Sequence, residues 1–439
     1  MSDVAELSTT LIESILNQST HIGIKKLSNN DRRWADGKQY GHQNGPYIPM
    51  EWREGTFFPP LLNVSPGKPH IFEARIPTCW VRGGEMKESR LVLYSNKGLE
   101  CHLTGVPKTE FAGISPASWF LIGKGELAGK PSWYCLVIDS ADEEAYLFVE
   151  TLFELAFDFE YGLFEVADVR RPNVPPPDFL EELLEALVQG EMLALTGRVV
   201  FPLTRDLAVQ AQNMWLAKSG EPDMNPFRLS APGDVLMQIS RDIEYRLFRK
   251  HTMRYYSARL LEMLSDGKAN PDLRTLVTSL VSRFDTIYKE VMISAGQRSK
   301  SRAGYSFELH VSRMLKDGNV PYEEQTVVGN QRPDFILPSR KVLQKSSRAR
   351  EEAFILSLKT VLRERWKQVL AENKNCDLFL GTVDDGITGA SIAEMRTHNI
   401  YLVVPERLKK AEYAEYESHE NVITFHDFFH RELKRRKLL

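Results

Sequence analysis

Two charged side chains stand at the ends of apolar runs that are typical of neighbouring strands. Asp334 opens the run in PDFILP, and Lys359 ends the run in AFILSLKT. Hydrolysis of a phosphodiester needs a hard cation, an activated water and a neutralised transition state. An aspartate and a lysine at one sheet edge could supply a cation ligand and a group that stabilises developing charge. The pair indicates a metal-dependent nuclease, although a strand-end Asp and Lys are more often a solvated ion pair.

A nuclease centre of this kind usually has a second carboxylate two residues before the lysine, where this chain has Ser357. Two other acids could complete the site. Glu308 lies in GYSFELHVSRML, which is expected to be a packed helix, and Glu372 lies on the helix expected after Lys359. Glu372 could reach back to the sheet edge in space, but periodicity alone favours an exposed helix-end position for it.

The triplet Arg363, Glu364 and Arg365 follows the lysine strand. Arginine can donate two hydrogen bonds to O6 and N7 of guanine, and glutamate can accept from the cytosine amino group. The triplet could therefore recognise G·C pairs in a major groove. The commoner alternative is a network of surface ion pairs on an amphipathic helix.

Three regions of the chain must position these residues. About 165 N-terminal residues hold short apolar or aromatic runs between turns, which predicts a β-rich sandwich or barrel. The segment DVRRPNVPPPDF (168–179) is a stiff proline-rich linker. Helices expected to stop at Gly267, Gly296 and Gly318 come next, and strands alternating with helices then indicate an α/β domain with a mixed sheet.

Composition excludes some classes of protein and leaves nucleic-acid partners open. The 439 residues are 42% hydrophobic and 26% charged, with a net charge of −3. No apolar run is long enough for a membrane span, so we expect no membrane partner. Four scattered cysteines without a CxxC pair fit a reducing cytoplasm. Basic runs at 297–302, 340–350 and 430–437, which singly indicate solvated surface, together favour a polyanion.

Several segments together resemble a known family. RSKSRAGYSFELH (298–310), RPDFILPS (332–339) and LKTVLRERWKQVLAE (358–372) are similar to the catalytic core of the EcoRII-type restriction endonucleases, the CCGG group with a rearranged PD-(D/E)xK centre. The run IKKLSNND…YGHQNGPYIP (24–49) resembles the effector domain of the same family. The resemblance touches both ends of the chain and keeps its order.

The resemblance implies a fold and a division into domains. Residues 1–170 would form a β-rich pseudobarrel of the plant B-three type that binds DNA, and 171–180 would be the linker. Residues 181–439 would form a restriction-endonuclease-like α/β/α domain around a mixed sheet, so the class is α+β with an α/β catalytic part. His42 and Tyr47 match effector-site positions, but the family's dense basic loop is reduced here to Lys97 and Lys108 in 94–110.

The family pattern also implies residue roles. Asp334 and Glu372 would hold Mg²⁺, with Glu308 as a further acid, and Lys359 would be the catalytic lysine. In this group the second carboxylate has moved to the following helix, which agrees with Ser357 and Glu372. The triplet at 363–365 matches the residues with which relatives recognise CC and GG base pairs.

The expected protein is thus a type II restriction endonuclease of the bacterial cytoplasm. It would cut double-stranded DNA at a palindromic site with CC and GG halves, leave 5′-phosphate ends, and act as a homodimer. Its functional partner would be a cognate DNA methyltransferase. Two alternatives remain, namely a repair nuclease or resolvase without sequence preference, and a DNA-binding regulator with an inactive nuclease core.

Overall fold

The computed structural model describes residues 8–37, 44–63, 67–98, 100–156, 158–171, 176–327, 332–362, 366–369, 375–436 and 438. The chain forms two compact units, each with its own sheet. Unit 1 comprises Met1–Arg171 together with Asp384–Thr397 and Arg407–Val422. Unit 2 comprises Pro172–Val383, His398–Glu406 and Ile423–Leu439.

The sheet of unit 1 has seven strands within the described residues, in the order β4-β3-β2-β6-β5-β1-β7. β2 and β6 are parallel, and the other neighbouring strands are antiparallel. Four of the apolar runs of this region coincide with β2, β3, β5 and β6, so the predicted β-rich N-terminal region is confirmed. These runs are HIFEARIP (70–77), SRLVLYSN (89–96), SWFLIGKG (118–125) and SWYCLVIDS (132–140). The strands are β1 (Ser19–Lys26), β2 (Ile71–Trp80), β3 (Glu85–Tyr94), β4 (Glu100–Thr104), β5 (Trp119–Leu127), β6 (Lys130–Ile138) and β7 (Tyr161–Glu165).

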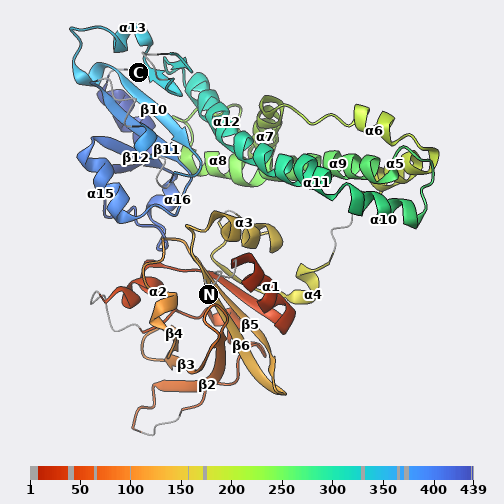
Figure 1. Ribbon diagram of the computed structural model, residues 1–439. Helices are drawn as coiled ribbons and strands as arrows, with labels where there is room; N and C mark the ends of the chain where they lie inside the picture. The colour runs from red at the N-terminus through yellow and green to blue at the C-terminus, as the bar shows by residue number, and fades with distance from the viewer. Residues whose placement is uncertain are drawn as a thin grey trace, which may run out of the picture. The chain divides into compact units, whose positions relative to one another are not determined.

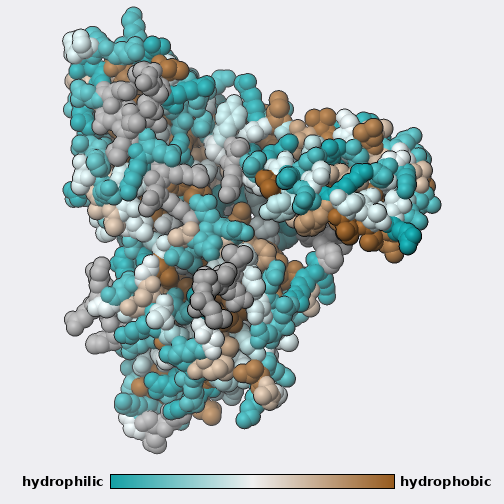
Figure 2. Space-filling view, in the orientation of Figure 1, coloured by the Kyte–Doolittle hydropathy of each residue, from teal (hydrophilic) through white to brown (hydrophobic). Residues whose placement is uncertain are grey.

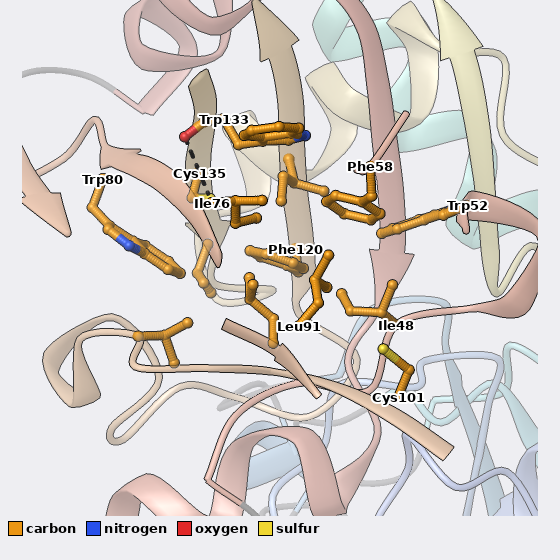
Figure 3. Close-up of a cluster of buried hydrophobic side chains, with 14 of the residues drawn as sticks. Ile48, Trp52, Phe58, Ile76, Trp80, Leu91, Cys101, Phe120, Trp133 and Cys135 are labelled. Atoms are coloured by element: carbon orange, nitrogen blue, oxygen red, sulfur yellow. Dashed lines mark hydrogen bonds between the residues drawn. The ribbon is translucent and has the colours of Figure 1, made fainter. Parts of the chain in front are cut away.

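This sheet is buried on both faces because its central strands are apolar at consecutive positions. Along β5, Phe120 and Ile122 enter one hydrophobic cluster, and Trp119 and Leu121 enter another. Figure 3 shows the first cluster, where Trp52, Trp80 and Trp133 gather around Phe120. The second lies under α1 and α3. The helices of this N-terminal part are α1 (Ser8–Gln18), α2 (Asn29–Arg33), α3 (Glu143–Leu152) and α4 (Val166–Val169).

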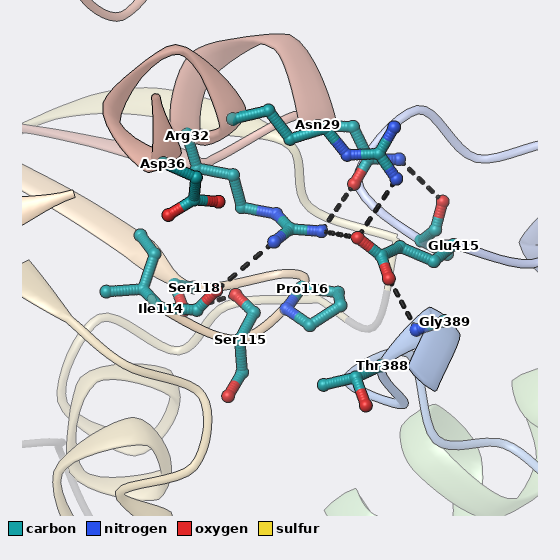
Figure 4. A network of polar contacts seen from close by, with 12 residues as sticks. Asn29, Arg32, Asp36, Ile114, Ser115, Pro116, Ser118, Thr388, Gly389 and Glu415 are labelled. Atoms are coloured by element: carbon teal, nitrogen blue, oxygen red, sulfur yellow. Dashed lines mark hydrogen bonds and ion pairs between the residues drawn. The ribbon is translucent and has the colours of Figure 1, made fainter. Parts of the chain in front are cut away.

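Two segments from late in the sequence complete unit 1. They carry α15 (Gly389–Thr397) and most of α16 (Glu406–Lys409). Buried Lys26 places its Nζ 2.8 Å from Oδ2 of Asp385. Arg32 forms an ion pair with Glu415, which also accepts a hydrogen bond from the backbone N–H of Gly389 (Figure 4). Burial raises the pKa of Glu415, but these cationic and amide partners outweigh it and leave that pKa lowered.

Unit 2 begins with helices, several of which form the elongated arm that carries α5, α6, α9, α10 and α11 in Figure 1. The α-helices of unit 2 are α5 (Pro177–Gln189), α6 (Met192–Arg198), α7 (Thr204–Ser219), α8 (Pro232–Gln238), α9 (Glu244–Ser265), α10 (Leu273–Ser282), α11 (Phe284–Ile287), α12 (Ser294–Asp317), α13 (Arg340–Leu343), α14 (Trp366–Val369), α17 (Phe425–Asp427) and α18 (Leu433–Arg435). Ile239–Ile243, Tyr288–Ile293 and Phe428–Glu432 are π-helical turns.

Two of the three predicted helix stops are confirmed and one is wrong. α9 ends at Ser265, just before Gly267, and α12 ends at Asp317 with Gly318 as its cap. Gly296 lies inside α12, so it ends no helix. An interior glycine costs about 1 kcal/mol of helix stability. Contacts made further along α12, which are described below, can offset that cost.

The sheet of unit 2 has the order β13-β12-β11-β10-β9-β8 over the described residues. β10, β11 and β12 run parallel, whereas β8, β9 and β10 pair antiparallel, so the predicted mixed sheet is confirmed. The strands are β8 (Glu323–Glu324), β9 (Phe335–Leu337), β10 (Phe354–Lys359), β11 (Asp377–Thr382), β12 (Ile400–Val404) and β13 (Val422–Thr424).

The helical arm exposes many large apolar side chains, and Figure 2 shows hydrophobic residues gathered over it. Contiguous apolar surface of this kind commonly marks an interaction face. No helix among the described residues has the length and apolar character needed to cross a bilayer. The exposed apolar residues of the arm include Leu180, Leu184, Val188, Leu193, Leu273, Val277, Leu280, Val281, Phe284, Tyr288 and Met292.

Candidate active site

Asp334 and Lys359 meet where β9 and β10 lie side by side. The antiparallel register sets Phe335 opposite Leu356, which brings Asp334 beside the last residues of β10. Oδ2 of Asp334 accepts a hydrogen bond from the backbone N–H of Leu358 at 2.7 Å and lies 3.6 Å from Nζ of Lys359. The aspartate is 8% exposed, while the lysine side chain is 30% exposed. One carboxylate is therefore fixed by the backbone, and the ammonium group beside it remains accessible to solvent.

Glu308 joins this pair from α12 through a residue that the sequence did not suggest. The side-chain Nε2 of Gln325 donates to Oε2 of Glu308 at 2.7 Å and to Oδ1 of Asp334 at 3.3 Å. Burial, followed by the negative charge of Asp334, raises the pKa of Glu308 to about 7, against smaller lowering effects of Gln325 and Lys359. Glu308 is thus a carboxyl group that gains or loses its proton near neutral pH.

The opposite face of α12 is held by a buried polar cluster. Arg302, Ser306 and His310 recur every four residues, so they share one face of the helix, and all three contact Glu244. The His310 Nε2 to Glu244 Oε2 distance is 2.8 Å, and Glu244 is fully buried. Burial raises the pKa of Glu244, but its bonds with His310, Arg302 and Ser306 leave that pKa lowered.

This anchoring cluster has a geometric consequence for the site. Glu308 lies two residues from both Ser306 and His310, about 200° away around the helix. A helix fixed on one face by charged hydrogen bonds therefore presents Glu308 from its other face in a fixed position. A further bond ties the cluster to α7, because Gln212 Nε2 lies 3.0 Å from Nδ1 of His310.

Ser357 occupies the position where an acid would usually stand. Alternation along β10 puts it on the same face as Lys359, and it is fully buried beside Leu380 of the parallel strand β11. A carboxylate at 357 would be removed from water in the middle of the sheet, which is costly. Glu308 on α12 is close enough to Lys359 for the lysine charge to lower the pKa of the glutamate, against the larger effects that raise it.

The donor set of the site fits a hard divalent cation. Mg²⁺ prefers oxygen ligands, with one or two carboxylates and several waters. Glu308 and Asp334 supply two converging carboxylates, of which the first is half-buried and the second buried. No group of three or more His, Cys, Asp or Glu side chains that could hold a metal is found among the described residues. Carboxylate oxygens completed by water are the ligands that a hard divalent cation such as Mg²⁺ prefers.

Several predicted site residues lie outside the described part of the chain. These are His42, Arg363, Glu364, Arg365 and Glu372. Tyr47 is described, in unit 1. Its backbone N–H donates to Asp31 at 2.7 Å, and its carbonyl accepts from Lys25 Nζ at 2.9 Å.

The basic runs are only partly available to a polyanion. Arg302 is buried in an ion pair with Glu244, and Arg436 is buried in ion pairs with Glu432 and Asp377. The run at 340–350 differs, because three of its cations lie at the surface. These are Arg340, Lys341 and Lys345.

Sequence reasoning missed Gln325 and Glu244. Gln325 follows a two-residue strand and has no periodic neighbours, so no local signal marks it. Glu244 could have been noticed, because it interrupts a run of apolar residues at helical spacing. An acid on the buried face of a helix predicts a buried partner of opposite charge. Each was missed because its contacts come from residues at least nine positions away in the chain.

The fold and site define a class of domain, namely a mixed sheet in which carboxylates and a lysine meet at the ends of two neighbouring strands. Residues 269–429 match the family described as EcoRII C terminal, so this part of the chain is similar to the C-terminal part of the EcoRII-type restriction endonucleases. The type II restriction enzyme EcoRII of Escherichia coli is 36% identical over 120 residues, which are 27% of this chain and 30% of that enzyme.

Two further relatives match larger parts of the chain. The type II restriction enzyme SsoII of Shigella sonnei is 24% identical over 215 residues, covering 45% of this chain and 67% of that enzyme. A solved structure described as metal-depleted Ecl18kI in complex with uncleaved DNA has 18% identity and a TM-score of 0.46, and the match covers 58% of this chain and 84% of the other. The chain thus matches less than a third of the length of EcoRII.

Proposed function

We propose that the protein is a type II restriction endonuclease that hydrolyses double-stranded DNA with Mg²⁺. The observation that carries this proposal is the meeting of Glu308, Asp334 and Lys359 at one edge of a mixed sheet. All three residues lie in the part of the chain that matches the EcoRII C-terminal family. Names of the relatives supply further support, since two are type II restriction enzymes and one was solved with DNA.

Each residue has a proposed role at the scissile phosphate. Asp334 and Glu372 hold the magnesium ion, and Glu308, the further acid of the site, is a third ligand of the same ion. When bound, the cation supplies an activated water and neutralises charge on the phosphate. Lys359 places its ammonium group beside Asp334, where it can orient the attacking water or stabilise developing negative charge. The expected products carry a 5′-phosphate and a 3′-hydroxyl.

Sequence selection is proposed for two parts of the chain. Arg363, Glu364 and Arg365 recognise CC and GG base pairs of a palindromic CCGG or CCNGG-like site, which requires a two-fold homodimer. The exposed apolar face of the helical arm supports association of this kind. Residues 1–170 form a B-three-like DNA-binding domain with contacts from His42 and Tyr47, and 171–180 are the linker. Residues 181–439 form the catalytic domain, apart from 384–397 and 407–422, which belong to unit 1. A cognate methyltransferase protects the host site.

Digestion of a mixed-sequence DNA library with and without Mg²⁺, followed by sequencing of the ends, tests this function. A restriction endonuclease gives ends that share one short palindrome with CC and GG halves. Ends without a shared sequence would indicate a repair nuclease or resolvase. Binding to DNA without cleavage in Mg²⁺ would indicate an inactive regulator.

A further inference from the structure

Gln325 occupies an unusual place between the two carboxylates of the site. It follows β8 with a φ of +49°, in the left-handed region that side chains seldom adopt. Both of its backbone polar groups are bonded: its N–H donates to the Asp334 carbonyl at 3.0 Å, and its own carbonyl accepts from Arg332 Nε at 2.9 Å. These bonds hold the residue where its side chain reaches Glu308 and Asp334 together.

The chemistry of the neighbours determines which end of the amide faces them. Ionised carboxylates only accept hydrogen bonds, so the NH₂ group of Gln325, and not its carbonyl oxygen, must point at Glu308 and Asp334. An NH₂ group carries partial positive charge, and when Glu308 is ionised it lies between two negative side chains. Among the described residues it is the one side chain that bonds to both carboxylates.

We propose that Gln325 is a placeholder for the cation, and that cation binding displaces its amide. This inference rests on the proposed function, because it assumes that Glu308 and Asp334 share a divalent ion. A cation using Oε2 of Glu308 and Oδ1 of Asp334 would compete for the two oxygens that the amide now occupies. Mg²⁺ requires oxygen contacts of about 2.0–2.1 Å, which an intervening N–H group does not permit.

The placeholder has a definite physical effect. Without an ion, two N–H donors offset the repulsion between the carboxylates and keep them apart at a fixed distance. When an ion binds, those hydrogen bonds are lost, so the free energy of cation binding is less favourable by the free energy of those bonds. Removing the amide should therefore strengthen cation binding, whereas removing a residue that merely supports the site should weaken it.

Mn²⁺ binding to the full chain, followed by electron paramagnetic resonance at pH 8, tests the proposal. Gln325→Ala keeps the Cβ atom, so the left-handed backbone is equally strained in both proteins and only the amide is lost. We expect it to bind Mn²⁺ roughly three- to tenfold more tightly, the equivalent of about one net hydrogen bond. Gln325→Glu puts a third carboxylate at the same point and should bind more tightly than Gln325→Ala. Gln344→Ala, at an exposed glutamine, should equal the wild type.

An affinity of Gln325→Ala equal to or below that of the wild type would overturn the placeholder while leaving the metal site standing. Failure of the wild type to bind Mn²⁺ at all would overturn both this inference and the proposed magnesium site. Side-chain amide NMR of glutamine-labelled wild type gives a second measurement that needs no variant to fold. Saturating Ca²⁺ should shift the Gln325 NH₂ signal, and an unmoved signal would contradict displacement.

Discussion

Lowering the pH from 8 to 6 should weaken cation binding at the site through Glu308. The pKa of this carboxyl is raised to about 7, first by burial and then by Asp334. Only ionised Glu308 can hold a cation, and roughly nine tenths of the molecules are ionised at pH 8 against about a tenth at pH 6. Binding should therefore weaken by about tenfold across this range, as measured by Mn²⁺ titration with electron paramagnetic resonance on the full chain.

When no cation is present, lowering the pH has the opposite effect on folding, because it increases the free energy of unfolding. Because the folded-state pKa of Glu308 lies above its ordinary value of 4.5, the folded chain binds this proton more tightly than the unfolded chain. Its contribution to the free energy of unfolding is present below pH 4.5 and is lost as the pH rises through about 7. Glu308→Gln is the matched control and should remove both pH dependences in this window. A wild-type Mn²⁺ affinity that is equal at pH 6 and pH 8 would refute the reasoning.

Four substitutions test other parts of the proposal. Lys359→Ala should abolish DNA cleavage but leave binding in a gel-shift assay nearly unchanged, and continued cleavage would remove Lys359 from its catalytic role. Glu372→Gln should also stop cleavage in Mg²⁺. Cleavage at the full wild-type rate would show that Glu372 is not an essential ligand of the metal. Arg365→Ala should lose about 1–3 kcal/mol of discrimination between cognate and altered DNA, so equal losses on both sequences would argue against base recognition. Glu244→Ala leaves Arg302 and His310 buried without their acid, and should lower the free energy of unfolding by about 3–5 kcal/mol in urea titrations; an unchanged midpoint would show that this cluster does not stabilise the chain.

Local sequence patterns predicted the elements of the fold better than they predicted the site. Strands β2, β3, β5 and β6 and strands β9 to β12 were recognisable because their apolar runs are bounded by turn residues, whereas β1, β4, β7, β8 and β13 were not predicted. Helices α9 and α12 end next to glycines as expected. Gly296 misled the prediction because a glycine also occurs inside a helix when distant contacts hold that helix together. Such contacts, like those of Glu244 with α12, have no local signature.

In the candidate site too, some residues could be predicted from the local sequence, whereas others depend on contacts between distant parts of the chain. Asp334 and Lys359 were suggested by their positions at strand ends, and Glu308 by its place in an expected packed helix. The resemblance to a family then implied that Glu308 is an acid of the site. Gln325 was not suggested, because its role depends on the pairing of β8 with β9 and on a backbone conformation that no composition rule predicts. The register between short strands is set by tertiary packing, so residues that act through register are found only in the folded structure.

Because unit 1 contains segments from late in the sequence, it cannot be completed until most of the chain has been translated. Its buried cations Lys26 and Arg32 pair with Asp385 and Glu415, which leave the ribosome long after Arg171. At about 5–20 residues per second, the roughly 210 to 240 residues that follow Arg171 delay those partners by about 10 to 50 seconds. During that interval the nascent N-terminal part carries two cations without the acids that neutralise them. A gene fragment that stops at residue 171 would lack both acids permanently, so we expect separate expression of this unit to succeed only when the late segments are supplied as well.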